Sequence, residues 1–167
     1  MRAQREGDDY VLDGVKRHVF YARAAHKLLV LARTGDEDES ISLFIVDADS
    51  AGLSYEQQRT MASDTQYKLT FNQVRVPQSA LVGAENSGWK TWTTALQEGL
   101  VLLAAWAVGG ADRALEITVQ YSKDREQFDK PIGAFQALAH YMADASTVVE
   151  GAKVLVLEAA WEHTEGK

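Results

Sequence analysis

Arg125 and Phe128, a basic and an aromatic residue three positions apart, are the residues of this sequence best suited to binding chemistry. They lie where one helical pattern stops, and the Pro-Ile-Gly turn at 131–133 leads into the next pattern, near Gln136. A guanidinium binds phosphate-like or carboxylate groups through two parallel hydrogen bonds. A cation in a last helical turn also stabilises the helix dipole, by about 0.3–1 kcal/mol. From the residues alone, both roles stay open for Arg125.

Other chemistry-bearing patterns are missing from the sequence. It contains no cysteine, and its four histidines (positions 18, 26, 140 and 163) do not have the spacing of metal ligands. A Ser-His-Asp motif, a phosphate-binding loop and a dinucleotide-binding fingerprint are also missing. We therefore expect no metal centre.

Composition narrows the classes of partner. The 167 residues carry a net charge of −7, which argues against nucleic acid because such surfaces need clustered Lys and Arg. No apolar run approaches the roughly 20 residues of a membrane span, and the N-terminus lacks the apolar core of a signal peptide. We therefore expect a cytoplasmic protein. Its 46% of hydrophobic residues are enough for a packed core.

The first half of the chain has the pattern of strands. Apolar, β-prone runs occupy residues 19–21, 27–32, 41–46 and 68–76, without helical spacers, which favours an antiparallel sheet or small barrel. Asp13-Gly14 is a plausible hairpin turn. The alternation of apolar residues changes parity at Asn72-Gln73, which predicts a β-bulge there.

The second half has helical spacing, with apolar residues three and four positions apart over about 87–123 and 134–165. Two helices cannot bury all these apolar sides, so we expect partners from the same chain or another subunit. Gly109-Gly110 indicates close approach by a neighbouring helix. The fold class is therefore α+β, with an antiparallel sheet or barrel-like β-domain (1–83) followed by two long antiparallel helices of an incomplete four-helix bundle (84–167).

Six segments, in order, resemble motifs of the acyl-CoA dehydrogenase family: 13–17, 41–46, 51–54, 69–83, 107–115 and 125–136. The last resembles the family's Arg-x-x-Phe-Gly-x-x-Ile/Leu-x-x-x-Gln block, and 69–83 its Phe-x-x-Val-x-Val-Pro segment. The resemblance runs from about residue 8 to the C-terminus. It implies the family's middle β-domain and the first half of its C-terminal helical domain. The chain is expected to be either a fragment of a longer enzyme or a natural short protein.

The resemblance implies an FAD cofactor, held across a subunit interface. The residues implied to bind it are Arg125, Phe128, Gln136, His18 and Phe20. Several positions depart from the family pattern. Asp129 replaces a glycine, Phe20 stands where the family has a hydroxyl-bearing residue, and Leu100 replaces an arginine.

The resemblance also implies an acyl-CoA substrate, which Leu96, Gly99 and Leu103 would contact. In one branch of the family the catalytic carboxylate sits at the position of Gly99, so a base must lie beyond Lys167 or be lost. The neighbouring Glu98 would project about 100° away around the helix and is expected to be a surface carboxylate.

The implied reaction oxidises the Cα–Cβ bond of an acyl-CoA thioester to a trans-2-enoyl-CoA, as in fatty-acid β-oxidation. Electrons would pass to an electron-transferring flavoprotein, and the enzyme would be a homo-oligomer (dimer or tetramer) or a subunit of a heteromeric dehydrogenase. One alternative is a non-catalytic or cofactor-poor homologue with a structural or assembly role, which the residues at positions 20, 99, 100 and 129 favour. Another is an acyl-CoA oxidase or flavin monooxygenase of the same superfamily.

Overall fold

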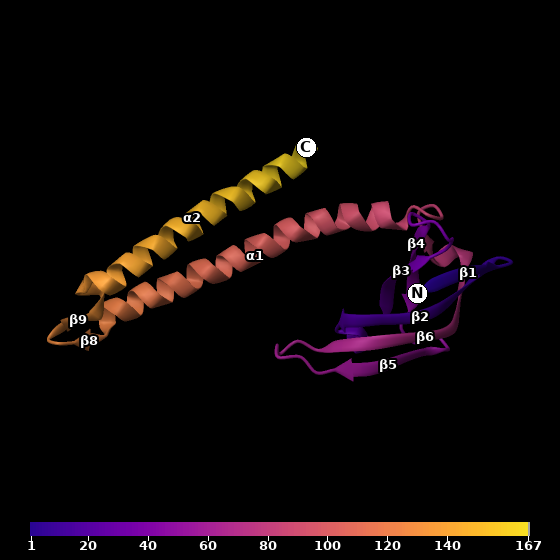
Figure 1. Cartoon of the computed structure of the whole chain (residues 1–167), viewed down its shortest axis with the longest axis horizontal. Coiled ribbons are helices and arrows are strands. Elements are labelled where there is room, and N and C mark those ends of the chain that lie inside the picture. The colour runs from indigo at the N-terminus through magenta and orange to yellow at the C-terminus, as the bar shows by residue number, and fades with distance from the viewer. Residues whose placement is uncertain (167) are drawn as a thin grey trace. The chain divides into compact units, whose positions relative to one another are not determined.

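The computed structural model describes residues 1–166, which divide into two compact units, Met1–Thr94 and the remainder from Ala95 onward. The division falls inside the long helix α1 (Gly88–Asp124). Figure 1 shows that strands make up most of the first unit and that two long helices dominate the second.

The first unit is built on one seven-stranded sheet with the order β5-β6-β2-β1-β3-β4-β7. The strands are β1 (Arg2–Glu6), β2 (Asp9–Phe20), β3 (Lys27–Arg33), β4 (Ile41–Asp47), β5 (Leu53–Gln58), β6 (Gln66–Pro77) and β7 (Leu81–Val82). All pairings are antiparallel except β1 with β3. The predicted antiparallel sheet is therefore confirmed. It is open, with β5 and β7 at its edges, so the closed-barrel alternative is not adopted within residues 1–166.

The core of this unit comes from one face of the strands, because side chains alternate between faces at period two. Tyr10 and Phe44 meet edge to face, with ring centroids 5.1 Å apart. The largest fully buried side chains are Tyr10, Phe44, Phe71, Leu12, Leu69, Val46 and Val74. Short 3₁₀ turns, η1 (Ala22–Ala24) and η2 (Gln78–Ala80), follow β2 and β6.

The predicted bulge at Asn72-Gln73 is confirmed. Leu12 pairs with Val74 and Gly14 with Phe71, so β6 has one residue more than β2 between these pairs. Gln73 takes a φ of 53°, and its side-chain amide donates to the Asp13 carboxylate at 3.1 Å.

The predicted hairpin turn at Asp13-Gly14 is wrong. Strand β2 continues through both residues, and the chain reverses earlier, at Gly7 and Asp8 between β1 and β2. The φ of 131° at Gly14 serves the pairing opposite the bulge of β6 and does not form a turn. The predicted run 19–21 is only the end of β2, since Tyr21 leaves the strand with a φ of 50°.

Helix α1 begins directly against the sheet. A Cβ atom on Gly88 would lie 2.4 Å from the backbone nitrogen of Leu43 in β4, a distance that excludes any side chain there. The first turn of α1 can therefore rest on β4 only because residue 88 is glycine.

The second unit pairs α1 with α2 (Gln136–Thr164) through a short connection, made of β8 (Glu126–Gln127), β9 (Lys130–Pro131) and the 3₁₀ turn η3 (Ile132–Ala134). The helices are antiparallel, because Asp112 lies 2.9 Å from Lys153 Nζ and Glu98 lies 3.6 Å from His163 Nε2. Figure 1 shows the two helices side by side. The two long antiparallel helices predicted from the sequence are thus present.

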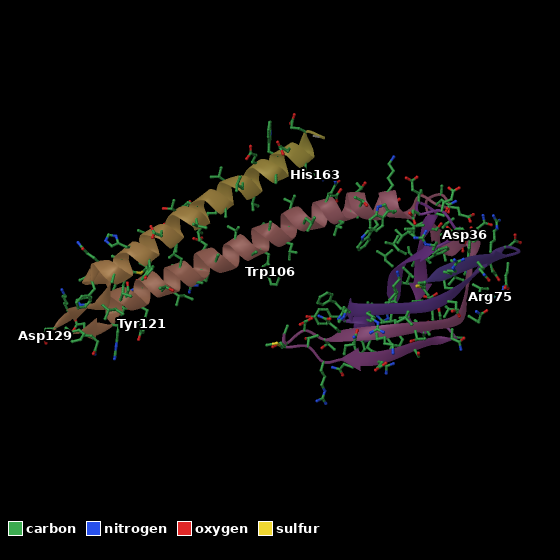
Figure 2. The ribbon with its side chains drawn as sticks, in the orientation of Figure 1. Asp36, Arg75, Trp106, Tyr121, Asp129 and His163 are labelled. Atoms are coloured by element: carbon green, nitrogen blue, oxygen red, sulfur yellow. The ribbon has the colours of Figure 1, made fainter. Side chains whose placement is uncertain are left out.

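The helices leave most of their apolar side chains exposed. Within the described part of α2 no residue is buried. The exposed apolar residues of the pair include Leu100, Leu102, Trp106, Ile117, Tyr121, Tyr141, Val148, Val154 and Leu157. Trp106, at 77% exposure, points away from α2 (Figure 2). Helix α2 is not the close neighbour predicted for Gly109-Gly110, since nothing in the described chain comes within 4 Å of a Cβ built on either glycine.

Candidate functional site

Arg125 is the first residue after α1, and its backbone is fixed on both sides. Its N–H donates to the Tyr121 carbonyl at 2.9 Å, and its carbonyl accepts from the Ile132 N–H at 2.8 Å. Its side chain is exposed and makes no hydrogen bond or ion pair within residues 1–166. The fold therefore presents a positioned guanidinium to the surroundings.

A two-residue turn joins β8 to β9 directly after Arg125. Gln127 pairs with Lys130, while Phe128 and Asp129 take φ values of 57° and 61°. Positive φ at both central residues defines a type I′ turn, which favours Asn-Gly and other glycine-containing pairs. Phe128 is 85% exposed, and Figure 2 shows Asp129 at the tip of this hairpin.

The hairpin packs against the residues that follow it, although the Phe128 ring is largely exposed. The rings of Phe128 and Phe135 meet edge to face at 6.1 Å, and Lys130 Nζ lies 4.3 Å from the Phe135 ring centroid. A Cβ on Gly133 would lie 2.8 Å from the hydroxyl of the buried Ser122. Close packing of η3 on the end of α1 thus fixes the hairpin.

Gln136 is the first residue of α2 and is exposed, without a side-chain cap at this helix end. The hairpin region also holds charges of both signs, from Lys123, Asp124, Arg125, Glu126, Asp129 and Lys130. Gln120 donates to the Asp124 carboxylate at 2.9 Å. The arrangement offers a cation and an aromatic face to an anionic, ring-containing ligand, and the carboxylate of Asp129 opposes the anionic part.

His18 and Phe20 lie near the C-terminal end of β2, in the first unit. His18 has a φ of 56° and sits in a second irregularity of the sheet, where β2 has one residue more than β6. Phe20 is 60% exposed, with its ring 6.5 Å from that of Tyr21. This end of β2 therefore carries an exposed aromatic ring, that of Phe20, two residues after the imidazole of His18.

Two glutamines fix His18, and no local pattern in the sequence indicates them. The His18 N–H donates to Gln58 Oε1 at 2.9 Å, and its Nδ1 lies 2.9 Å from Gln66 Oε1. Gln66 in turn donates to the Asp64 carboxylate at 2.5 Å. Period-two patterning places a residue on a face but does not reveal which residue of another strand lies opposite, so no local signal identifies these partners.

Leu96, Gly99 and Leu103 lie on α1 at spacings of three and four, which places them on one side of the helix. Both leucines are exposed, at 42% and 53%, and apart from the adjoining residues of α1 itself no described atom lies within 4 Å of a Cβ built on Gly99. Glu98 instead faces α2, where it lies 3.6 Å from His163. A base beyond Lys167, as predicted, lies outside the described residues.

The structure thus groups the candidate residues separately in each unit: His18 with Phe20, and Arg125 with Phe128 and Gln136. No cluster of three or more His, Asp or Glu side chains in the described chain is arranged to hold a metal ion. The search for a membrane-crossing helix among the described residues found none of sufficient length and hydropathy.

Comparison with known proteins places both halves in one family. Residues 1–74 match the family model of the acyl-CoA dehydrogenase middle domain, and residues 86–167 match that of the acyl-CoA dehydrogenase C-terminal domain. A probable acyl-CoA dehydrogenase of Bacillus subtilis (strain 168) is 36% identical over 167 residues, which cover 96% of this chain and 44% of that protein.

Solved structures agree with these matches. Butyryl-CoA dehydrogenase from Megasphaera elsdenii superposes with a TM-score of 0.92 at 33% identity, over 99% of this chain and 45% of that one. A structure described as the electron transferring flavoprotein of Acidaminococcus fermentans gives a TM-score of 0.93 at 36% identity, over 99% and 45%.

The chain therefore spans less than half the length of the relatives it matches. The middle-domain model matches before the C-terminal-domain model, which agrees with the order of the motifs in the sequence. The superposed fold agrees with the same family. This chain belongs to the acyl-CoA dehydrogenase family.

Proposed function

We propose that this chain is part of an FAD-dependent acyl-CoA dehydrogenase that oxidises the Cα–Cβ bond of an acyl-CoA thioester to a trans-2-enoyl-CoA. The observation that carries the proposal is the hairpin at Arg125, where a fixed backbone presents a guanidinium that has no partner within residues 1–166, in a chain of this family. Residues 1–83 would form the β-domain and residues 84–167 the first half of the helical domain. We place the enzyme in the cytoplasm and in fatty-acid β-oxidation.

The residues of the hairpin suit a flavin dinucleotide. Arg125 would bind the pyrophosphate through two parallel hydrogen bonds, the geometry for which a guanidinium is preorganised. Phe128 would contribute aromatic surface, and Gln136 hydrogen-bonding capacity at the start of α2. Phe20 and His18 would face the ring of a flavin held across a subunit interface, with the hairpin residues supplied by a neighbouring subunit. The bound flavin would supply hydride acceptance, which no side chain provides.

The exposed apolar side of α1 suits an acyl chain. Leu96 and Leu103 flank Gly99, where the missing side chain leaves room along the helix. Burial of apolar surface at about 25 cal/mol per Å² would hold such a chain. No described carboxylate is assigned as the base, because Glu98 faces His163 on α2.

The exposed apolar faces of α1 and α2 support a subunit interface, because monomeric proteins rarely expose large contiguous apolar patches. We propose a homodimer or homotetramer, or a heteromeric dehydrogenase. The electron acceptor would be an electron-transferring flavoprotein, a proposal supported by the likeness to a structure described by that name.

The proposal is tested by the visible spectrum of the purified full-length natural protein, with and without added FAD. We expect one flavin per chain, bleached when an acyl-CoA is added. A protein that binds no flavin at micromolar FAD would overturn the proposal.

Replacing Arg125 by alanine tests the residue that carries the proposal. A hydrogen bond to a charged group contributes about 1.5–3 kcal/mol, so Arg125→Ala should weaken FAD binding roughly 10- to 150-fold and leave helicity unchanged. The matched control is Arg113→Ala, since Arg113 is an exposed arginine of α1 that pairs with Glu116 on its own helix. If Arg125→Ala kept its flavin occupancy unchanged, Arg125 would only stabilise the end of α1 and would not bind the cofactor.

A non-catalytic homologue with an assembly role is the second candidate. Phe20 supplies no hydroxyl at the ring-facing position, Gly99 supplies no carboxylate, and Asp129 adds a negative charge beside Arg125. The same spectrum decides between the two, because an assembly subunit would form the oligomer without flavin.

A further inference from the structure

The side chains of Phe20, Gln66 and Gln58 form a row across three neighbouring strands at one edge of the sheet. Phe20 of β2 pairs with Gln66 of β6, and Gln66 pairs with Gln58 of β5. Residues directly opposite in an antiparallel pair point to the same face. The His18 imidazole contacts Gln66, so it lies on the face that also carries the exposed ring of Phe20.

The strained backbone of His18 is stabilised by this row. A φ of 56° is uncommon for a residue with a Cβ, and such strain persists only where surrounding contacts determine it. Because His18 lies in the bulge, its backbone N–H is not used in the pairing of β2 with β6. This N–H donates instead to Gln58 Oε1 at 2.9 Å. The conformation of His18 therefore depends on a side chain 40 residues away in sequence.

The hydrogen bonds beyond His18 have a fixed direction. The Asp64 carboxylate accepts from Gln66 Nε2 at 2.5 Å. An ionised carboxylate only accepts, so the amide of Gln66 must turn its NH₂ group to Asp64 and its oxygen to His18. Because Gln66 Oε1 also only accepts, Nδ1 of His18 must be the protonated nitrogen of the neutral ring.

We propose that Asp64 and Gln66 are positioning residues that hold His18 in its Nδ1–H form, so that Nε2 accepts a hydrogen bond from a planar heteroaromatic ligand stacked on Phe20. The ligand is one with a ring N–H donor. The proposal rests on the proposed function, in which that ring is the flavin. Asp64 and Gln66 act through His18 and do not touch the ligand themselves.

The first test measures the tautomer without any ligand. In the full chain labelled with ¹³C and ¹⁵N at histidine, the His18 signals are assigned by their loss in His18→Asn. We expect the neutral ring of His18 in the Nδ1–H form. In Asp64→Asn the amide of Gln66 is free to turn round, so the tautomers should mix. A predominant Nε2–H form in the unaltered chain would overturn the proposal.

The second test measures FAD affinity in the full-length natural protein. Loss of one well-placed hydrogen bond weakens binding up to about tenfold, so we expect about that loss in Gln66→Leu and in Asp64→Asn. Gln57→Leu is the matched control, since the exposed side chain of Gln57 has no partner in residues 1–166, and its affinity should change less than twofold. Circular dichroism checks that each variant folds.

The two failures are distinguishable. If the unaltered protein binds no FAD, the proposed function and the assignment of the ligand both fall, while the tautomer measurement still decides the positioning role. If FAD binds and the two variants retain full affinity, the proposed function stands and the role of His18 toward the ring is overturned.

Discussion

Among the single residues, Asp129 adds both backbone strain and a negative charge to the hairpin. Its φ of 61° costs conformational energy that glycine would not incur, and its carboxylate stands in the hairpin that presents Arg125. Phe128 adopts a similar φ of 57° and keeps its ring on Phe135. The hairpin thus keeps the exposed aromatic side chain at its tip while tolerating strain in both turn residues.

The strain and the charge at this position are separable. Asp129→Gly should raise the free energy of unfolding by about 1 kcal/mol, because glycine adopts positive φ without steric cost. Asp129→Ala removes the same charge but keeps a Cβ, so it should not stabilise the chain. Both variants should bind FAD more tightly. Denaturant unfolding and FAD titration measure the two effects, and equal stability of the two variants would contradict the backbone explanation.

At the scale of elements, Lys153 ties α2 to α1. Its ammonium group contacts Glu150 on its own helix at 2.8 Å and Asp112 on α1 at 2.9 Å. Hydrogen bonds to Glu150 and Asp112 raise the pKa of Lys153 above its ordinary value of 10.5. Many of the large apolar side chains of the two helices are exposed.

The pH dependence of helix pairing follows from the direction of this shift. A cation whose pKa is raised on folding contributes stability that is fully present below 10.5 and is lost as the pH rises through the folded pKa. The melting temperature followed at the helical circular dichroism signal should therefore fall more steeply above pH 10.5 in the unaltered chain than in Lys153→Met. Parallel pH profiles of the two proteins would show that the contact contributes nothing.

At the scale of the whole molecule, buried apolar side chains are concentrated in the first unit. Tyr10, Leu12, Phe44 and Phe71 are almost fully buried there, whereas the described part of α2 buries no residue. The sheet therefore has its own hydrophobic core. The helices, by contrast, need further partners to cover their apolar faces.

Truncation of the core should affect the first unit. Phe44→Ala should lower its free energy of unfolding by about 3–5 kcal/mol, because Phe44 is fully buried and packs on Tyr10. Hydrogen exchange of the β3 and β4 amides reports this loss. Met61→Ala, in an exposed loop of the same unit, should change stability by less than about 0.5 kcal/mol. Protection of these amides that survives Phe44→Ala would contradict the assignment of the core.

Local patterns in the sequence are enough to predict the element types and the family. Helical spacing predicted the two long helices, and the change of parity at Asn72-Gln73 predicted the bulge, because both are local periodicities written along one segment. Asp13-Gly14 was wrong for a related reason. The same dipeptide suits a turn or an irregular strand, and the choice depended on β6 lying opposite.

The surroundings of the candidate residues depend on how distant segments of the chain meet in the fold. The backbone that positions the candidates Arg125 and Phe128 is local, since the partners of the hairpin lie within a few residues. The environment of His18 is not local, since Gln58 and Gln66 lie 40 and 48 residues away. Their contact depends on strand register, in which a shift of one residue moves every side chain to the other face, and only the assembled sheet sets that register.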